Sequence, residues 1–84
     1  MHKIHRSDNT QGEIVAALRK ACVSVWVIGR PVDLLTYYRG RWLPLEIKTR
    51  SKLRMDQEAQ TKLLATYAVP VVRSAQEALD AVMR

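Results

Sequence analysis

Two β-rich segments separated by a three-residue turn constrain this chain more than any other feature. The segments VDLLTYY and WLPLEIK flank the sequence RGR, whose centre is Gly40. A connection this short joins two strands as a hairpin, because glycine adopts the backbone angles that a tight turn needs. Pro44 must then lie at a sheet edge or a bulge, since proline cannot donate to a strand ladder.

The segments before the hairpin indicate a helix followed by a strand. T-x-x-E from Thr10 to Glu13 has the form of a capping box, and Ile14, Leu18 and Cys22 follow at helical spacing. The apolar run VSVWVIG at residues 23–29 is typical of a strand buried on both faces.

The segments after the hairpin indicate a helix, a strand and a second helix. MDQEAQTKLLATYA is helical, with Asp56 as its cap and a stripe formed by Ala59, Leu63 and Tyr67. VPVVR is a short strand, and SAQEALDAVMR opens with a capping box from Ser74 to Glu77. Its expected inward residues are Ala75, Ala78, Leu79 and Val82. The predicted order, α-β-β-β-α-β-α, belongs to the α/β class.

Composition limits the chain to one small globular domain. Its 84 residues allow a single core over 1–84, with a polar, basic leader at residues 1–8. Hydrophobic residues make up 48% and charged residues 26%, which argues against disorder. The lone Cys22 cannot form an internal disulfide, and it is expected to pack as a small hydrophobe.

Charge and hydropathy indicate the kind of partner and the compartment. The formal net charge of +6 favours a polyanionic partner, because Lys and Arg that neutralise phosphates release condensed counterions. No apolar run approaches the roughly 18 to 20 residues that span a bilayer, and MHKIHRSDNT lacks the apolar segment of a signal peptide. We therefore expect a cytoplasmic protein that does not bind membranes.

The predicted third strand places an acid and an amine on one face. Strand alternation puts Glu46 and Lys48 opposite Leu45 and Ile47, a pattern that a solvated sheet face also produces. Asp33 opens the preceding strand, so the hairpin brings a second carboxylate alongside. Two carboxylates, a carbonyl and water suit Mg²⁺, which polarises phosphodiesters and activates an attacking water. The lysine would orient that water or stabilise the developing charge.

With these residues, PVDLLTYYRGRWLPLEIK resembles the PD-(D/E)XK nuclease superfamily, in which an aspartate opens one strand and E-x-K lies in the next. LEIKTRSKLRMDQEA is similar to the small VRR-NUC domains of phages and prophages, whose E-x-K precedes a basic loop, a leucine and a glutamine-bearing helix start. The resemblance extends from about Gln11 to Val82. It implies a restriction-endonuclease-like core, αβββαβ plus a C-terminal helix, with a mixed central sheet flanked by helices.

The resemblance also implies roles for individual residues. Asp33 and Glu46 would ligate Mg²⁺, for which Mn²⁺ would substitute. The carbonyl of Ile47 would add a ligand, and Lys48 would be the catalytic lysine. Glu13 matches a glutamate on the first helix that helps to complete the metal site.

Three of the implied site residues fit a purely structural role as well. Glu13 is equally accounted for as the third residue of its capping box. The implied role of Gln57 is to support the site or reach DNA, but glutamine is also a good first-turn helix residue. Asp33 is otherwise a turn residue after Pro31, and the proline that the family carries directly before its aspartate is Val32 here.

The basic and aromatic residues also fit more than one role. A basic run follows Lys48 and would hold the phosphate backbone, although such a run is usually a solvated loop. Its members are Arg50, Lys52 and Arg54, and Arg39 and Arg41 at the hairpin tip extend it. The aromatic residues are expected to pack in the core, with base stacking less favoured. These are Trp26, Tyr37, Tyr38, Trp42 and Tyr67, whereas His2 and His5 lack the spacing of metal ligands.

These features together predict a Mg²⁺-dependent DNA endonuclease that acts in a bacterial or phage-infected host cell. The resemblance implies a homodimer that favours branched or structured DNA, including four-way junctions, and the sequence leaves the choice among a junction, a flap and plain duplex open. One alternative is a non-catalytic nucleic-acid-binding module of the same fold, whose acidic cluster is structural. Another is a protein-interaction subunit whose basic face meets an acidic partner.

Overall fold

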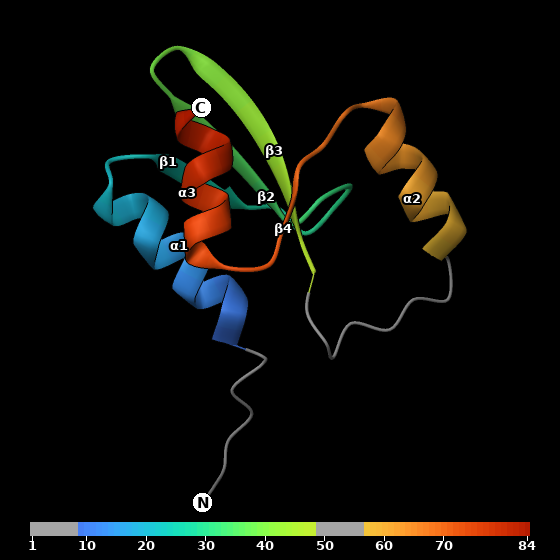
Figure 1. The fold of residues 1–84 in the computed structure, drawn as a ribbon, viewed down its shortest axis with the longest axis horizontal. Coiled ribbons are helices and arrows are strands. Elements are labelled where there is room, and N and C mark those ends of the chain that lie inside the picture. The colour runs from blue at the N-terminus through green and yellow to red at the C-terminus, as the bar shows by residue number, and fades with distance from the viewer. Residues whose placement is uncertain (1–8, 49–56) are drawn as a thin grey trace, which may run out of the picture.

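Three helices and a four-stranded sheet make up the part of the chain that the computed structural model describes, residues 9–48 and 57–84 (Figure 1). In chain order the elements are α1 (Thr10–Lys20), β1 (Ser24–Val27), β2 (Leu34–Tyr38), β3 (Arg41–Ile47), α2 (Gln57–Thr66), β4 (Val71–Val72) and α3 (Ala75–Met83). The predicted element order and the α/β class are confirmed. Among the described residues, no helix combines the length and the apolar character that crossing a membrane requires.

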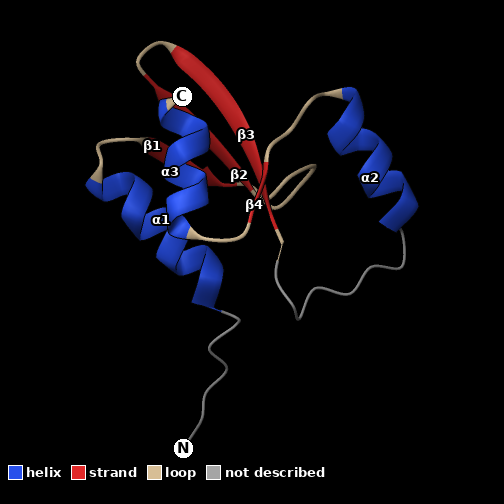
Figure 2. Cartoon of the chain, viewed as in Figure 1, coloured by secondary structure: helices blue, strands red, loops and turns tan. Residues whose placement is uncertain are grey.

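The sheet is mixed and its strands follow chain order, β1-β2-β3-β4 (Figure 2). β1, β2 and β3 form an antiparallel meander, whereas β4 runs parallel to β3. The hairpin pairs Tyr38 with Arg41, so the turn contains only Arg39 and Gly40, with φ of 51° and 82°. Two positive φ angles define a type I′ turn, which matches the twist of the strands. The predicted hairpin about Gly40 is confirmed.

Pro44 lies in a part of β3 that pairs with a neighbouring strand on one side only. It pairs with Leu35 on the β2 side. The backbone N–H of Glu46 donates to the carbonyl of Pro70, 3.0 Å away, so the amide nitrogens of even-numbered β3 residues face β4. The β3–β4 pairing begins at Glu46, so it does not reach Pro44, where a missing N–H costs no ladder bond. The predicted edge position of Pro44 is thereby confirmed.

The core lies between one face of the sheet and the pair α1 and α3, which pack against each other. Odd-numbered residues of β3 and even-numbered residues of β2 point into it, as alternation requires. Ile14, Leu18, Leu34 and Leu45 are fully buried at its centre. Among the predicted inward residues of α3, Ala78 and Val82 are buried, and Ala75 and Leu79 are half-buried.

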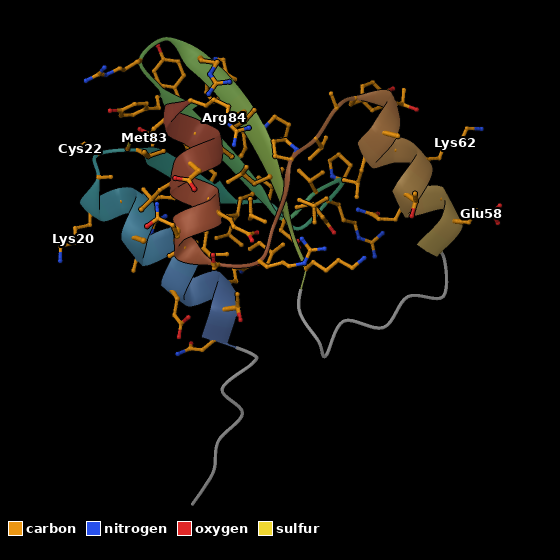
Figure 3. The ribbon with its side chains drawn as sticks, viewed as in Figure 1. Lys20, Cys22, Glu58, Lys62, Met83 and Arg84 are labelled. Atoms are coloured by element: carbon orange, nitrogen blue, oxygen red, sulfur yellow. The ribbon has the colours of Figure 1, made fainter. Side chains whose placement is uncertain are left out.

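α2 stands apart from the other two helices and from β1–β3 (Figure 1). Its predicted apolar stripe does not face the core: Ala59 and Tyr67 are exposed and Leu63 is half-buried. Figure 3 shows Glu58 and Lys62 pointing outward from this helix. The proposed cap, Asp56, lies outside the described residues. The expectation that this stripe packs inward is therefore wrong.

β1 departs from its prediction because it forms the other edge of the sheet. Only Val25 of its four residues is buried, while Ser24, Trp26 and Val27 are exposed. Helices cover only one face of this edge strand, so the expectation that the strand is buried on both faces is wrong.

The ends of α1 differ from prediction as well. Asn9 takes the N-cap position and Thr10 is the first helical residue, so Glu13 is not the third residue of a capping box. Cys22 follows the helix at φ 68° and is exposed rather than packed. At this helix end, the N–H of Val23 donates to the carbonyl of Leu18 at 3.0 Å. The N–H of Cys22 donates to the carbonyl of Arg19, also at 3.0 Å. These two bonds form a Schellman cap, which requires a left-handed residue at position 22.

The Ser74 half of the predicted capping box of α3 is confirmed. The hydroxyl of Ser74 accepts a hydrogen bond from the N–H of Glu77 at 3.2 Å. The Glu77 carboxylate accepts from the N–H of Arg73 at 2.8 Å, one residue before the N-cap, where a capping box would bind the N–H of the N-cap itself. The side chain of Ser74 thus satisfies one of the free N–H groups at the helix start.

Candidate functional site

Asp33 lies against the end of β3, where the sequence predicted a second carboxylate. Its Oδ2 accepts a hydrogen bond of 2.8 Å from the backbone N–H of Ile47. The β2–β3 register pairs Leu34 with Leu45, and its continuation sets Asp33 opposite Glu46. The carbonyl of Asp33 also accepts from the N–H groups of Ile28 and Gly29, at 3.0 and 3.2 Å. The side chain thus fixes the aspartate to the strand that carries E-x-K, and its backbone carbonyl fixes it to the segment that follows β1.

Glu46 is buried, with only 4% of its surface exposed. It is held on both sides, because its strand pairs with β2 and its N–H donates to the carbonyl of Pro70. Leu45 and Ile47 point into the core, so the Glu46 side chain leaves the opposite face of the sheet. A solvated sheet face does not describe this position. A carboxylate occupies a buried site at the centre of the sheet.

Lys48 follows β3 directly and is exposed. Its backbone N–H donates to the carbonyl of Val72 at 3.0 Å, which continues the parallel ladder beyond the last assigned strand residue. The ladder therefore fixes the backbone from Glu46 to Lys48, and alternation puts both side chains on the same face. Together, Asp33, Glu46 and Lys48 form what we call the acid–lysine site, where the start of β2 meets the ends of β3 and β4.

The donor set of this site fits a hard divalent cation. Two carboxylates and the carbonyl of Ile47 are the oxygen ligands that Mg²⁺ and Mn²⁺ take in proteins. Among residues 9–48 and 57–84, no group of three or more His, Cys, Asp or Glu side chains gathers closely enough to hold an ion. Glu13, exposed in α1, therefore does not join Asp33 and Glu46 in a three-acid cluster. Its predicted part in completing the metal site gains no support from its position.

Several predicted site residues fall where the structure describes little. Arg50, Lys52 and Arg54 lie outside the described residues. Gln57 is the first residue of α2, but only its backbone is described. Its implied role therefore stays a prediction.

The two arginines at the hairpin tip lie at the opposite end of β2 and β3 from the acid–lysine site. The Arg39 guanidinium lies over the Tyr38 ring, 5.3 Å from its centroid. Arg41 donates to the carbonyls of Ala81 and Val82 at 3.2 and 2.8 Å, in the last turn of α3. A hollow of about 460 Å³ here is lined by Tyr38, Arg39, Arg41, Val82, Met83 and Arg84, the last two labelled in Figure 3. Arg41 thus stabilises the end of α3, and its role in DNA binding stays a prediction.

The aromatic residues are where the sequence interpretation is most in error. Trp26, Tyr37 and Trp42 are 47%, 37% and 57% exposed, and Tyr67 is 71% exposed. Only Tyr38 packs against the core as expected. The sequence did indicate the exposure of Trp42. Side chains alternate between the two faces of a strand, so if Leu43, Leu45 and Ile47 face the core, Trp42 must face away from it.

No protein-family model, curated protein or solved structure matches this chain. The geometry of the acid–lysine site, together with the charge of the chain, is therefore the basis for assigning a function.

Proposed function

We propose that this chain is a Mg²⁺-dependent DNA endonuclease of the PD-(D/E)XK type, similar to the small VRR-NUC domains. The observation that carries the proposal is the 2.8 Å hydrogen bond from the Ile47 N–H to Asp33 Oδ2. It joins an aspartate at the start of one strand to the E-x-K segment of the next, as this chemistry requires. The element order and the mixed sheet agree with the restriction-endonuclease-like core that the resemblance implies.

Asp33, Glu46 and the carbonyl of Ile47 are the groups that would hold the metal ion. When bound, Mg²⁺ polarises a phosphodiester and makes an attacking water more acidic. Lys48 supplies a positive charge on the same face of β3, where it would orient the water or offset charge developing on the phosphate. Burial of Glu46 excludes water from one side of the site and strengthens its electrostatic interactions.

The proposed substrate is DNA, with branched or structured forms favoured. The net charge of +6 supports association with a polyanion. The basic residues at 50, 52 and 54 continue directly from Lys48 and would contact the phosphate backbone next to the cleaved bond. A homodimer would present two such sites, and it would also thicken the thin core of an 84-residue domain.

A cleavage assay tests the proposal. Plasmid, flap and four-way-junction DNA are incubated with the protein in Mg²⁺, Mn²⁺ or EDTA. We expect metal-dependent nicking that Lys48→Ala and Glu46→Gln each abolish while DNA binding persists. Lys62→Ala is the matched control, because this lysine is exposed on α2, which stands apart from the rest of the fold, and it should cut normally.

One observation favours a second candidate, a non-catalytic nucleic-acid-binding module. The Asp33 carboxylate already has a structural task, since it binds the N–H of a strand residue. Salt-dependent DNA binding without cutting under any metal condition would support this module and contradict the nuclease. Absence of DNA affinity at low salt would contradict both, because phosphate contacts are strongest there.

A further inference from the structure

Three aromatic side chains cover part of the sheet face that the helices leave open. We define the aromatic face as Trp26 of β1, Tyr37 of β2 and Trp42 of β3. The Trp42 ring centroid lies 5.6 Å from that of Trp26 and 4.9 Å from that of Tyr37. The strand register accounts for these contacts. Tyr37 pairs directly with Trp42, and Trp26 pairs with Leu35, which lies two residues before Tyr37 in β2 and on the same face. Trp42 touches both neighbours and is the most exposed of the three.

The aromatic face lies on the same side of the sheet as the acid–lysine site. Trp42 and Glu46 leave β3 on the same side, four residues apart, which is about 13 Å along a strand. Between them lies the rung formed by Leu35 and Pro44, both half-buried. This distance equals a few nucleotides of one DNA strand, which rise about 3.4 Å each when stacked. A strand with its phosphate at the acids would have its neighbouring bases over the aromatic rings.

The three rings form one contiguous exposed patch, and the largest such patch of a protein often has a function. Adjacent exposed aromatic rings are typical of binding surfaces, whereas single exposed apolar residues are ordinary. From their exposed fractions, the three side chains offer roughly 300 Å² of surface, taking about 150–250 Å² for each whole side chain. A stable protein interface needs about 800 Å² per partner. The aromatic face falls well short of that, but it is large enough for one or two bases.

The charges around this face also favour nucleic acid over a protein partner. Exposed Arg30 lies in the connection between β1 and β2, whereas Arg39 of the hairpin turn lies over Tyr38 on the helix side of the sheet. Lys48 closes the same face at the acid–lysine site. Flat aromatic rings bordered by cations bind single-stranded nucleic acid, because every base has a face that can stack and every nucleotide carries a phosphate.

We propose that the aromatic face binds unpaired bases of single-stranded DNA by stacking, with Trp42 as its main position. The inference deepens the proposed nuclease function and rests on it for the nature of the ligand. It identifies the preferred substrate as DNA with unpaired nucleotides beside the cleaved phosphate. Fully paired DNA keeps its bases stacked inside the duplex and gains nothing from this face.

Binding measurements in EDTA test the proposal without cleavage. The intrinsic tryptophan fluorescence of the full chain is titrated with a short oligothymidine, and fluorescence anisotropy gives the affinity for the same strand and for a duplex of equal length. We expect the oligothymidine to quench the fluorescence. Trp42→Ala should weaken single-strand affinity by about 5- to 150-fold, the range that one base–aromatic stack supports. Duplex affinity should stay within about twofold.

Two further variants separate loss of stacking from loss of folding. Trp42→Phe keeps a stacking ring and should restore most of the single-strand affinity. Tyr67→Ala removes an aromatic residue that is 71% exposed but lies outside the aromatic face, and it should bind as wild type. If Trp42→Ala fails to fold, Trp26→Ala at the edge strand takes its place, and quenching of the wild-type protein needs no variant at all.

Unquenched fluorescence, or equal losses for single strand and duplex, would overturn the inference. It would also be overturned if Trp42→Ala kept its single-strand affinity while light scattering showed a smaller particle, because the face would then join two copies of the chain. Selective single-strand binding without any metal-dependent cutting would leave the stacking site standing and remove the nuclease. If the wild-type protein cut DNA with a metal ion but Trp42→Ala bound single-stranded DNA as tightly as wild type, the nuclease would stand and the stacking site would be ruled out.

Discussion

Replacing Asp33 with alanine removes the carboxylate oxygen that accepts the 2.8 Å hydrogen bond from the Ile47 N–H. Ile47 is only 3% exposed, so water cannot easily take the place of that acceptor. A buried donor that loses its acceptor costs about 1–3 kcal/mol, and the charge of the acceptor adds to the loss. Asp33 itself is half-buried, and solvent screening puts the expected value near the middle of that range, about 2 kcal/mol.

The loss is large for so small a domain. Stability of about 0.05–0.15 kcal/mol per residue gives a chain of this size about 4–13 kcal/mol in total. In domains of 60–100 residues, each kcal/mol shifts Tm by about 4–8 °C, so Asp33→Ala should melt roughly 8–16 °C below wild type. Asp33→Asn keeps a neutral acceptor of the same shape and should lose about 1 kcal/mol or less.

Urea unfolding followed by circular dichroism measures both variants. Asp80→Ala is the control, because Asp80 is an exposed carboxylate that accepts a 2.9 Å bond from Gln76 within α3. Such a pair contributes only a few tenths of a kcal/mol. If Asp33→Ala unfolded within about 0.5 kcal/mol of wild type, the contact would not fix the aspartate to β3, and the geometric case for the site would fail.

Three further substitutions test other parts of the fold. Arg41→Ala should lower the unfolding free energy by about 1 kcal/mol and speed hydrogen exchange at the end of α3, whose carbonyls lose their donor. Cys22→Gly should raise stability by about 0.5–1 kcal/mol, because glycine adopts φ 68° without strain, and a lower urea midpoint would contradict this. Glu46→Gln should unfold within about 1 kcal/mol of wild type while cutting is lost, since an amide of equal size costs less to bury than a carboxylate. A loss above about 2 kcal/mol would make Glu46 a structural residue.

The hairpin was predictable from the sequence, but its exact register was not. The sequence interpretation made RGR a three-residue turn, whereas the structure pairs Tyr38 with Arg41 and leaves only Arg39 and Gly40 in the turn. Counting outward from this turn pairs Leu34 with Leu45 and brings Asp33 opposite Glu46. Alternation within each strand was predictable, because a period of two is visible in a single sequence.

The surroundings of the sheet were not predictable in the same way. Alternation divides residues between two faces, but it does not say which face a helix covers. Both faces of β2 carry apolar residues, with Leu34 on one and Leu35 and Tyr37 on the other. Within residues 9–48 and 57–84, α1 and α3 pack on the same side of the sheet, and α2 stands apart from β1–β3, so the aromatic residues of the other face remain exposed. Core packing of Trp26, Tyr37 and Trp42 is the wrong expectation because alternation places them on the face away from the core, and the sequence does not show whether a helix covers that face.

Helix ends were predictable to within a residue. Asn9 and Thr10 are both good N-cap residues, and the choice between them decides whether Glu13 belongs to a capping box. That choice also bears on function. Because Glu13 is not tied to the helix start, its carboxylate has no capping task that would account for its presence. A role beside Asp33 and Glu46 would still require a closer approach than the described residues show.

The position of Glu46 relates it to the aromatic face. Both lie on the side of the sheet away from the core, with Glu46 one rung from Trp26 and two rungs from Trp42. The two tryptophans are about half exposed, so they forgo part of the hydrophobic stabilisation that burial would supply. A DNA strand that stacked on these rings would cover them, and binding would then raise the stability of the folded chain.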